Sequence, residues 1–391
     1  MNKKILIITG PTATGKTELA IKLAKKFNGE IVNADSRQVY QGMDIGTGKD
    51  IENKSKIKNQ NARLQMLSHS ECGQAKLHIK NQKFTIGFRL KNNIPVWLVD
   101  ICKPDYVFNV GEYQKFARLV IYDIQNRRKL PIIVGGTGLY IRSIIEPLNK
   151  ISIPPNEKLR QQLNDFTVKQ LQNKLHQLNK NKFESLNNSD RNNPRRLIRA
   201  IEIEEYNLSF WSSDNPPAGG GTIESKYLKK DAISASRRIQ HDDIITNSPL
   251  PKGEYLLIGL KMSQELLAQN IDKRVEKRYQ QGILDEIKQL LKSGYTWNLP
   301  SMSGLGYREW KQFFVSSKFE VRGSKKLEII NPSTALRKEI LDLWKLHENQ
   351  YVKKQLTFLK KIPNINWFDV SKPDYYLSIE TKVHQWYNQN I

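Results

Sequence analysis

Residues 10 to 17 read GPTATGKT and carry the clearest chemical signal in the chain. They fit the spacing G-x-x-x-x-G-K-[ST], with an apolar run before them and a helical pattern after them. In such a loop, glycines let backbone N–H groups surround a phosphate at a helix N-terminus. Lys16 adds a positive charge, and the hydroxyl of Thr17 can bind a magnesium ion. The loop predicts a phosphorylated ligand, but its spacing does not say which one.

Two carboxylates follow other apolar runs. Asp35 lies in NADSRQVYQGMDIGTGK, and Asp100 lies in IPVWLVDICKPD. Either one can cap the segment after it or assist a magnesium ion, and Asp35 can instead act as a base facing the phosphate. An aspartate with an ordinary pKa near ~3.9 is a weak base at neutral pH. It therefore suits a group that turns acidic only as a bond forms, such as an aromatic amine during alkylation.

A second glycine-rich turn occurs in PIIVGGTGLY. Gly135, Gly136 and Gly138 allow a ligand to approach the backbone closely, and Thr137 offers a hydroxyl. Taken alone, the stretch is equally typical of a tight structural turn. Two such turns at neighbouring strand ends favour a highly charged ligand such as a diphosphate.

Four short apolar runs place these residues: KILIIT, EIVNA, IPVWLV and LPIIV. Helical patterns at 18–27 and 111–128 separate several of them, which predicts an α/β fold with a P-loop-type parallel sheet flanked by helices. Ligands of such sheets bind at the carboxyl ends of the strands. We therefore expect the residues after the four runs to meet at one edge of the sheet.

Changes in composition and pattern along the chain suggest its domain boundaries. Residues 1–147 are expected to form the first part of a P-loop catalytic core, 148–254 a mainly helical insertion with a loop-like segment from 207, and 255–391 the rest of the core with C-terminal helices. Within the first part, 51–93 looks like a further insertion, with KFTIGFRL at 83–90 as an extra hairpin strand. Residues 263–294 predict a long amphipathic helix or helix pair. Its other face carries Lys273, Arg274, Lys277 and Arg278, and we expect Lys277 to be solvated.

The charge is strongly positive: 63 Lys and Arg against 39 Asp and Glu give a net charge of +24. Such a surplus favours a polyanionic partner, with nucleic acid the leading candidate, although a Lys-rich composition alone can produce it. Only Cys72 and Cys102 are present, which argues against a zinc site or a disulfide framework and suits a reducing cytoplasm. No apolar stretch approaches the length of a membrane span.

The motifs together closely resemble those of the bacterial tRNA dimethylallyltransferases. They are, in chain order, GPTATGKT, IVNADSRQVYQGMDIGTGK, LVDICKPD, LPIIVGGTGLY, NNPRRLIRAIEI, GILDEIKQL, GLGYREW and KKQLTFLK. They span residues 10 to about 360, nearly the whole chain. The family transfers a dimethylallyl group from its diphosphate to the exocyclic amine of the adenosine just 3′ of the anticodon in tRNA. The resemblance implies that this P-loop holds the diphosphate of an isoprenoid.

Roles follow from the resemblance by matching motif. Asp35 would be the general base, Thr137 would donate to the leaving group, and Lys16 and Thr17 would hold the diphosphate and Mg²⁺. The remaining diphosphate-binding residues would be Gly10, Pro11, Thr12, Ala13, Thr14, Gly15 and Arg274. The tRNA contacts would be Asp35, Ser36, Arg37, Gln38, Thr137, Arg160, Arg195, Arg196, Arg199, Ser303, Gly304, Gly306, Tyr307 and Arg308, with part of 353–360. The chain departs from the family at Asn270, where an arginine is usual.

The expected partners are the anticodon loop of tRNA and dimethylallyl diphosphate, with no membrane and with the chain as a cytoplasmic monomer. Two enzymatic alternatives share the P-loop and the parallel sheet: a small-molecule kinase and an isopentenyltransferase acting on AMP or ATP. The basic surplus and the tRNA-contact segments count against both. A P-loop protein that binds RNA without catalysis is a third alternative, in which Asp35 would have no activity to support.

Overall fold

The computed structural model describes residues 4–49, 76–79, 82–146, 153, 155–211, 254–316 and 332–389. The chain divides into two compact units. One comprises Met1–Pro147 together with Ser248–Ile391, and the other comprises Leu148–Asn247. The predicted insertions at 51–93 and 207–254 fall largely outside the described residues, as does Cys72. In the described ranges no helix is both long and apolar enough to cross a membrane.

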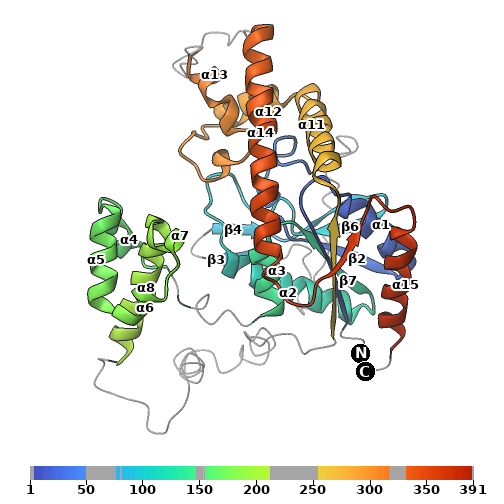
Figure 1. Cartoon of the computed structure of the whole chain (residues 1–391), viewed down its shortest axis with the longest axis horizontal. Helices are drawn as coiled ribbons and strands as arrows, with labels where there is room; N and C mark the ends of the chain where they lie inside the picture. The colour runs from blue at the N-terminus through green and yellow to red at the C-terminus, as the bar shows by residue number, and fades with distance from the viewer. Residues whose placement is uncertain are drawn as a thin grey trace. The chain divides into compact units, whose positions relative to one another are not determined.

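The first unit is built on a sheet with the strand order β5-β6-β2-β7-β1-β8-β9 (Figure 1). All neighbouring strands in it run parallel except β5, which pairs antiparallel with β6 at one edge. The strands are β1 (Ile5–Thr9), β2 (Gly29–Asn33), β5 (Phe88–Lys91), β6 (Ile94–Trp97), β7 (Leu130–Gly135), β8 (Tyr255–Lys261) and β9 (Asn366–Asp369). A separate antiparallel pair joins β3 (Lys76–Ile79) and β4 (Gln82–Thr85). The predicted P-loop-type α/β fold is confirmed.

Helices cover both faces of this sheet, and every residue of its central strands β1, β2 and β7 is buried. The even-numbered Leu6 and Ile8 of β1 pack with helices α1 (Lys16–Lys26) and α15 (Tyr375–Asn388). The odd-numbered Ile5 and Ile7 belong to the larger cluster on the opposite face, which includes side chains of α2 (Val110–Asn126) and α3 (Gly138–Ile145). Alternate residues of one strand thus bury two cores.

The rest of the first unit is helical. It contains α11 (Gln264–Gln280), α12 (Ile283–Lys292), the short 3₁₀ turns η2 (Ser301–Ser303) and η3 (Arg308–Trp310), α13 (Lys311–Ser316) and the long α14 (Thr334–Leu359). The predicted helix at 263–294 is therefore a pair, which breaks at Gly282, whose φ is 93°. The second unit contains α4 (Glu157–Leu163), α5 (Val168–Leu178), α6 (Lys180–Glu184), α7 (Asn188–Arg191) and α8 (Pro194–Trp211).

Three points differ from the expectations. The stretch KFTIGFRL is divided between β4 and β5, which belong to different sheets. The apolar run that forms β8 was not predicted, although it pairs with β1 along its length. Residues 207–211, expected to be loop-like, continue α8. On the basic face of α11, Arg278 is buried and forms an ion pair of 3.0 Å with Glu348, because α14 packs against this helix.

Candidate active site

The P-loop between β1 and α1 folds tightly around its own carbonyl groups. Gly10 has a φ of 145°, and a Cβ placed there would lie 2.6 Å from the carbonyl oxygen of Leu260. Gly15 precedes α1 with a φ of 78°, in the left-handed region that favours glycine. Lys16 Nζ and Thr14 Oγ1 both donate to the carbonyl of Pro11, at 2.5 and 2.9 Å. The lysine head group therefore lies inside the loop, where an anion would bind.

The charges around Lys16 come from two other elements. Burial and the neighbouring Arg274 guanidinium lower the pKa of the Lys16 ammonium to about 7, against the effect of the Asp35 carboxylate, which raises it. These influences reach Lys16 only if both groups lie close to it. The P-loop cation, a second cation and a carboxylate therefore share one small region.

Asp35 and Thr137 are held together by backbone hydrogen bonds at the ends of β2 and β7. The N–H of Thr137 donates to the carbonyl of Ala34 at 3.2 Å, and Thr137 Oγ1 accepts from the N–H of Ser36 at 3.1 Å. Asp35 Oδ1 accepts from the N–H of Arg37 at 2.8 Å. This bond fixes the carboxylate and leaves the lone pairs of Oδ2 for another donor.

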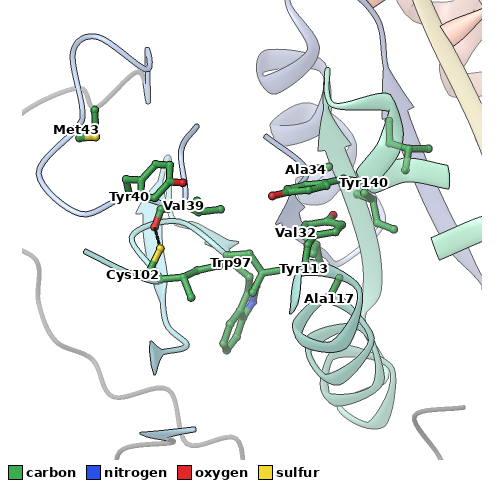
Figure 2. Close-up of a cluster of buried hydrophobic side chains, with 14 of the residues drawn as sticks. Val32, Ala34, Val39, Tyr40, Met43, Trp97, Cys102, Tyr113, Ala117 and Tyr140 are labelled. Atoms are coloured by element: carbon green, nitrogen blue, oxygen red, sulfur yellow. Dashed lines mark hydrogen bonds between the residues drawn. The ribbon is translucent and has the colours of Figure 1, made fainter. Parts of the chain in front are cut away.

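Two stacked aromatic rings pack next to the ends of β2 and β7. Tyr140 of α3 stacks on Tyr113 of α2, with ring centroids 3.9 Å apart and planes 11° from parallel. Figure 2 shows both rings close to Ala34, the residue directly before Asp35, and on the same side as Val32. On the other side of the cluster the thiol of Cys102 donates to the carbonyl of Val39 at 3.8 Å. Burial raises the pKa of this thiol to about 12, so it acts as a small apolar group.

Helix α11 supplies the P-loop with two polar side chains. Arg274 Nη1 donates to Thr12 Oγ1 at 2.5 Å. One turn earlier, Asn270 Nδ2 lies 3.4 Å from the carbonyl of Ala13. The position at which the chain departs from the family pattern therefore borders the P-loop directly. A longer cationic side chain there would reach the same loop as Arg274.

The carboxylate of Asp100 lies in a network of ion pairs. It pairs with Arg89 and, at 2.5 Å, with Lys49. Asp44 binds the same two cations, at 2.9 Å from Lys49 and 3.2 Å from Arg89. Two carboxylates and two cations thus compensate one another and tie the 44–49 loop to the end of β6. No helix begins at Asp100, and its association with magnesium stays a prediction.

The segments predicted to contact tRNA in the first unit lie against each other. Arg37 Nη1 donates to the carbonyl of Pro300 at 2.7 Å, joining residues 35–38 to residues 300–308. Ser303 and Arg308 are exposed, and Arg308 pairs with Glu309 at 2.8 Å. The side chain of Tyr307 is instead fully buried, and its hydroxyl donates to Glu286 at 2.7 Å. Its ring supports the segment, and its assignment as a tRNA contact stays a prediction.

Glycines allow the close packing of this region. A Cβ on Gly46 would lie 2.3 Å from the ring of Tyr307, and one on Gly306 would lie 2.6 Å from Trp344. Gly304 is buried next to Arg37, and Gln38 Nε2 donates to the carbonyl of Gly48 at 3.2 Å. These residues shape the surface rather than supply its charge.

In the second unit, two of the predicted arginines hold a buried carboxylate. Arg160 donates to both oxygens of Glu202, at 2.7 and 3.0 Å, and Arg199 donates to it at 3.1 Å. Burial raises the pKa of Glu202, but the hydrogen bonds from Arg160, the Asn156 N–H and Arg199 outweigh burial and leave it lowered. Arg195 is exposed, and the exposed Arg196 pairs with Asp190.

Within the described residues no group of three or more His, Cys, Asp or Glu side chains could bind a metal ion by itself. Thr17, at the start of α1, is half-buried and remains the protein ligand that the P-loop offers. Magnesium binds through few protein ligands when substrate phosphates and water complete its shell. The donor set at the P-loop therefore fits an ion that arrives with a diphosphate.

Comparison with known proteins identifies the family. A model described as IPP transferase matches residues 75–362, and one described as isopentenyl transferase matches residues 3–65. A protein of Anoxybacillus flavithermus named tRNA dimethylallyltransferase is 32% identical over 371 residues, which cover 95% of this chain and 92% of that protein. The chain belongs to the IPP transferase family.

Solved structures agree with this membership. The full-length tRNA isopentenylpyrophosphate transferase of Bacillus halodurans is 26% identical, with a TM-score of 0.56 and coverage of 98% of this chain and 97% of that one. The tRNA isopentenylpyrophosphate transferase of Staphylococcus epidermidis is 28% identical, with a TM-score of 0.54 and coverage of 98% and 99%. A eukaryotic dimethylallyltransferase shares the fold at 20% identity, with a TM-score of 0.61. The IPP transferase fold therefore extends over nearly all of this chain.

Two residues of this IPP transferase that organise the site were not singled out from the sequence. Glu286 accepts three backbone N–H groups of the 44–46 loop, at 2.8, 2.7 and 3.0 Å. Gln355 contacts both glycine-rich turns. Each lies in a motif quoted for the family resemblance, GILDEIKQL or KKQLTFLK, which was the only signal in the sequence that marked them.

Proposed function

We propose that this chain transfers a dimethylallyl group from dimethylallyl diphosphate to the exocyclic amine of the adenosine next to the anticodon of tRNA. Diphosphate is released. The relatives named tRNA dimethylallyltransferase cover nearly the whole chain and support this reading.

The single observation that carries the proposal is the arrangement at the ends of β1, β7 and β2. These strands are adjacent in the sheet and run parallel, so their carboxyl ends face the same way. The P-loop follows β1, Thr137 follows β7 and Asp35 follows β2. An anion site and a carboxylate base therefore lie at one edge, where an electrophile and a nucleophile can meet.

The chemistry follows from the roles of these groups. The allylic carbon–oxygen bond breaks, its electrons leave with the diphosphate, and the amine nitrogen forms the new bond to carbon. The amine becomes acidic as this bond forms, so Asp35 can take its proton despite being a weak base. Lys16, Arg274 and the P-loop N–H groups stabilise the charge that grows on the leaving oxygen, more in the transition state than in the substrate.

Thr137 would assist the leaving group. Its hydroxyl oxygen accepts the Ser36 N–H, while its own proton makes only a 3.4 Å contact with Ser36 Oγ. That proton can turn towards a diphosphate oxygen without breaking a strong bond. Thr17 would contribute its hydroxyl to a magnesium ion bound with the diphosphate, and the ion would neutralise part of the developing charge.

The tRNA substrate accounts for the excess of basic residues. A stacked base cannot reach a carboxylate at the edge of a sheet, so the adenosine must be turned out of the anticodon loop. Proteins commonly read RNA sequence in such single-stranded loops. The net charge of +24 would bind the phosphate backbone, with Arg37, Arg308 and the arginines of the second unit as candidate contacts.

The test is a transfer assay with isoprenoid-labelled dimethylallyl diphosphate and three acceptors in parallel: unmodified tRNA, AMP and ATP. The proposal expects label in tRNA alone. Label in AMP or ATP would assign the chain to nucleotide prenylation. Turnover of ATP without any prenyl transfer would reject the proposal in favour of a kinase.

A further inference from the structure

One side chain of α14 touches both glycine-rich turns of the site. Gln355 Oε1 accepts the backbone N–H of Thr12 in the P-loop at 3.0 Å. Its Nε2 donates to the carbonyl of Gly136, after β7, at 3.2 Å. Both partners are backbone groups whose polarity is fixed, so only one orientation of the amide satisfies them. The side chain is 8% exposed, which makes these bonds costly to lose.

The contact depends on close packing. A Cβ on Gly136 would lie 2.4 Å from Gln355 Nε2, so any larger residue there would push the amide away. The next turn of α14 repeats the pattern, because a Cβ on Gly138 would lie 2.3 Å from the ring of Phe358. Two glycines of the 135–138 turn are therefore each packed against a side chain of α14, and these two side chains lie one helical turn apart.

The helix also reaches the third strand end. Tyr351 lies one turn before Gln355 on the same face of α14. Burial and the nearby Asp35 carboxylate raise the pKa of the Tyr351 hydroxyl to about 12, although the residue as a whole is 38% exposed. Helix α14 thus contacts the P-loop, the Gly136 turn and the surroundings of Asp35.

Thr12 is fixed from two sides. Its N–H is bonded to Gln355, and its hydroxyl accepts from Arg274 at 2.5 Å. This N–H points to the helix rather than to an anion, unlike the donors that a P-loop normally offers to phosphate. The hydrogen bond between Thr12 and Gln355 therefore fixes the position of the P-loop. The other N–H groups of the loop are left to bind the ligand.

We propose that Gln355 is a positioning residue for prenyl transfer, whose amide sets the spacing between the P-loop and the Gly136 turn. In this way it aligns the diphosphate with Asp35 and Thr137. The inference rests on the proposed function. It goes beyond it by assigning the alignment of the two anion-binding turns to a side chain that follows them by more than two hundred residues.

Two variants separate this role from simple packing. Gln355→Met keeps the length of the side chain and removes both hydrogen bonds. Gln355→Glu keeps the acceptor for Thr12, and its protonated form also restores a donor to Gly136. Burial raises the pKa of such a carboxyl group, which brings its titration towards the range of the assay. Gln350→Met is the matched control, because Gln350 is exposed on the same helix.

The measurement is kcat for prenyl transfer between pH 6 and 8, expressed as the ratio of variant to unaltered protein at each pH. The dissociation constant for tRNA and the unfolding temperature are measured alongside. We expect Gln355→Met to lower kcat at least about tenfold at every pH, with tRNA binding within about twofold. The ratio for Gln355→Glu should rise as the pH falls, and Gln350→Met should match the unaltered protein.

Two results would overturn the inference. One is a kcat for Gln355→Met equal to that of the unaltered protein. The other is a ratio for Gln355→Glu that stays flat and equals that of Gln355→Met, with both losses explained by the unfolded fraction. If the unaltered protein itself fails to modify tRNA, the proposed function fails instead, so the two failures are distinguishable.

Discussion

The hydroxyl of Tyr307 donates a hydrogen bond of 2.7 Å to the carboxylate of Glu286. The same carboxylate accepts the backbone N–H groups of Asp44, Ile45 and Gly46. A single buried side chain of α12 therefore holds the loop after β2 against the segment that contains Tyr307. Both segments border the predicted tRNA surface.

Replacing Glu286 should lower the stability of the protein. Glu286→Ala leaves three backbone donors and one phenol without a partner, so we expect the free energy of unfolding to fall by about 3 kcal/mol or more. Tyr307→Phe removes one bond to a charged group and should cost about 1.5 kcal/mol. Denaturant unfolding measures both. Asp285→Asn, at the exposed neighbouring position, is the control, and an equal loss in that variant would contradict the account.

Asp100 and Thr17 should differ in their effect on magnesium. Asp100 is occupied by Lys49 and Arg89, so Asp100→Asn should lower the unfolding temperature and leave the half-saturating magnesium concentration for transfer unchanged. Thr17→Val should raise that concentration several-fold, and Thr17→Ser should restore it. The measurement is transfer rate against magnesium concentration. A magnesium requirement raised by Asp100→Asn as much as by Thr17→Val would return Asp100 to the metal site.

The pH dependence of diphosphate binding should follow the protonation state of Lys16. The pKa of this group is lowered to about 7, so it loses its proton as the pH rises through that value in the free protein. The charged form binds an anion better, and affinity for inorganic diphosphate should therefore fall above pH 7, by at most about tenfold per pH unit. Binding at pH 8 should take up a proton.

Calorimetry in buffers of different ionisation enthalpy measures that proton uptake. Diphosphate itself titrates in this range, so the same titration with Lys16→Met gives its contribution. The unaltered protein should take up more protons at pH 8 than the variant does. Equal uptake by the two proteins would show that Lys16 stays charged and that its pKa is not lowered.

Local pattern predicted much of the sheet. The apolar runs that became β1, β2, β6, β7 and β9 are short and bounded by polar or glycine-rich turns, so each could be recognised alone. The run that became β8 is equally apolar but follows a long stretch without periodicity, and it was passed over. Its place beside β1 depends on pairing between residues about 250 positions apart, which no local pattern records.

Local pattern likewise predicted some residues of the site and not others. Lys16, Asp35 and Thr137 were found because each follows a strand, and strand ends converge in a parallel sheet. Glu286 and Gln355 act on backbone groups more than two hundred residues away, and their own helices give no sign of it. The ion pair of Arg278 with Glu348 could not be predicted, because helical periodicity describes one helix and not the neighbour that packs on it.

The central claim is that Asp35 accepts a proton from an amine attacking a diphosphate ester held by the P-loop. Its most direct test is the single-turnover rate of transfer by Asp35→Asn, which keeps the shape of the side chain and the bond to the Arg37 N–H but removes the base. We expect the rate to fall by about 10²–10⁴-fold while the dissociation constant for tRNA changes by less than about threefold. A variant that transfers the dimethylallyl group at the rate of the unaltered protein would contradict the account.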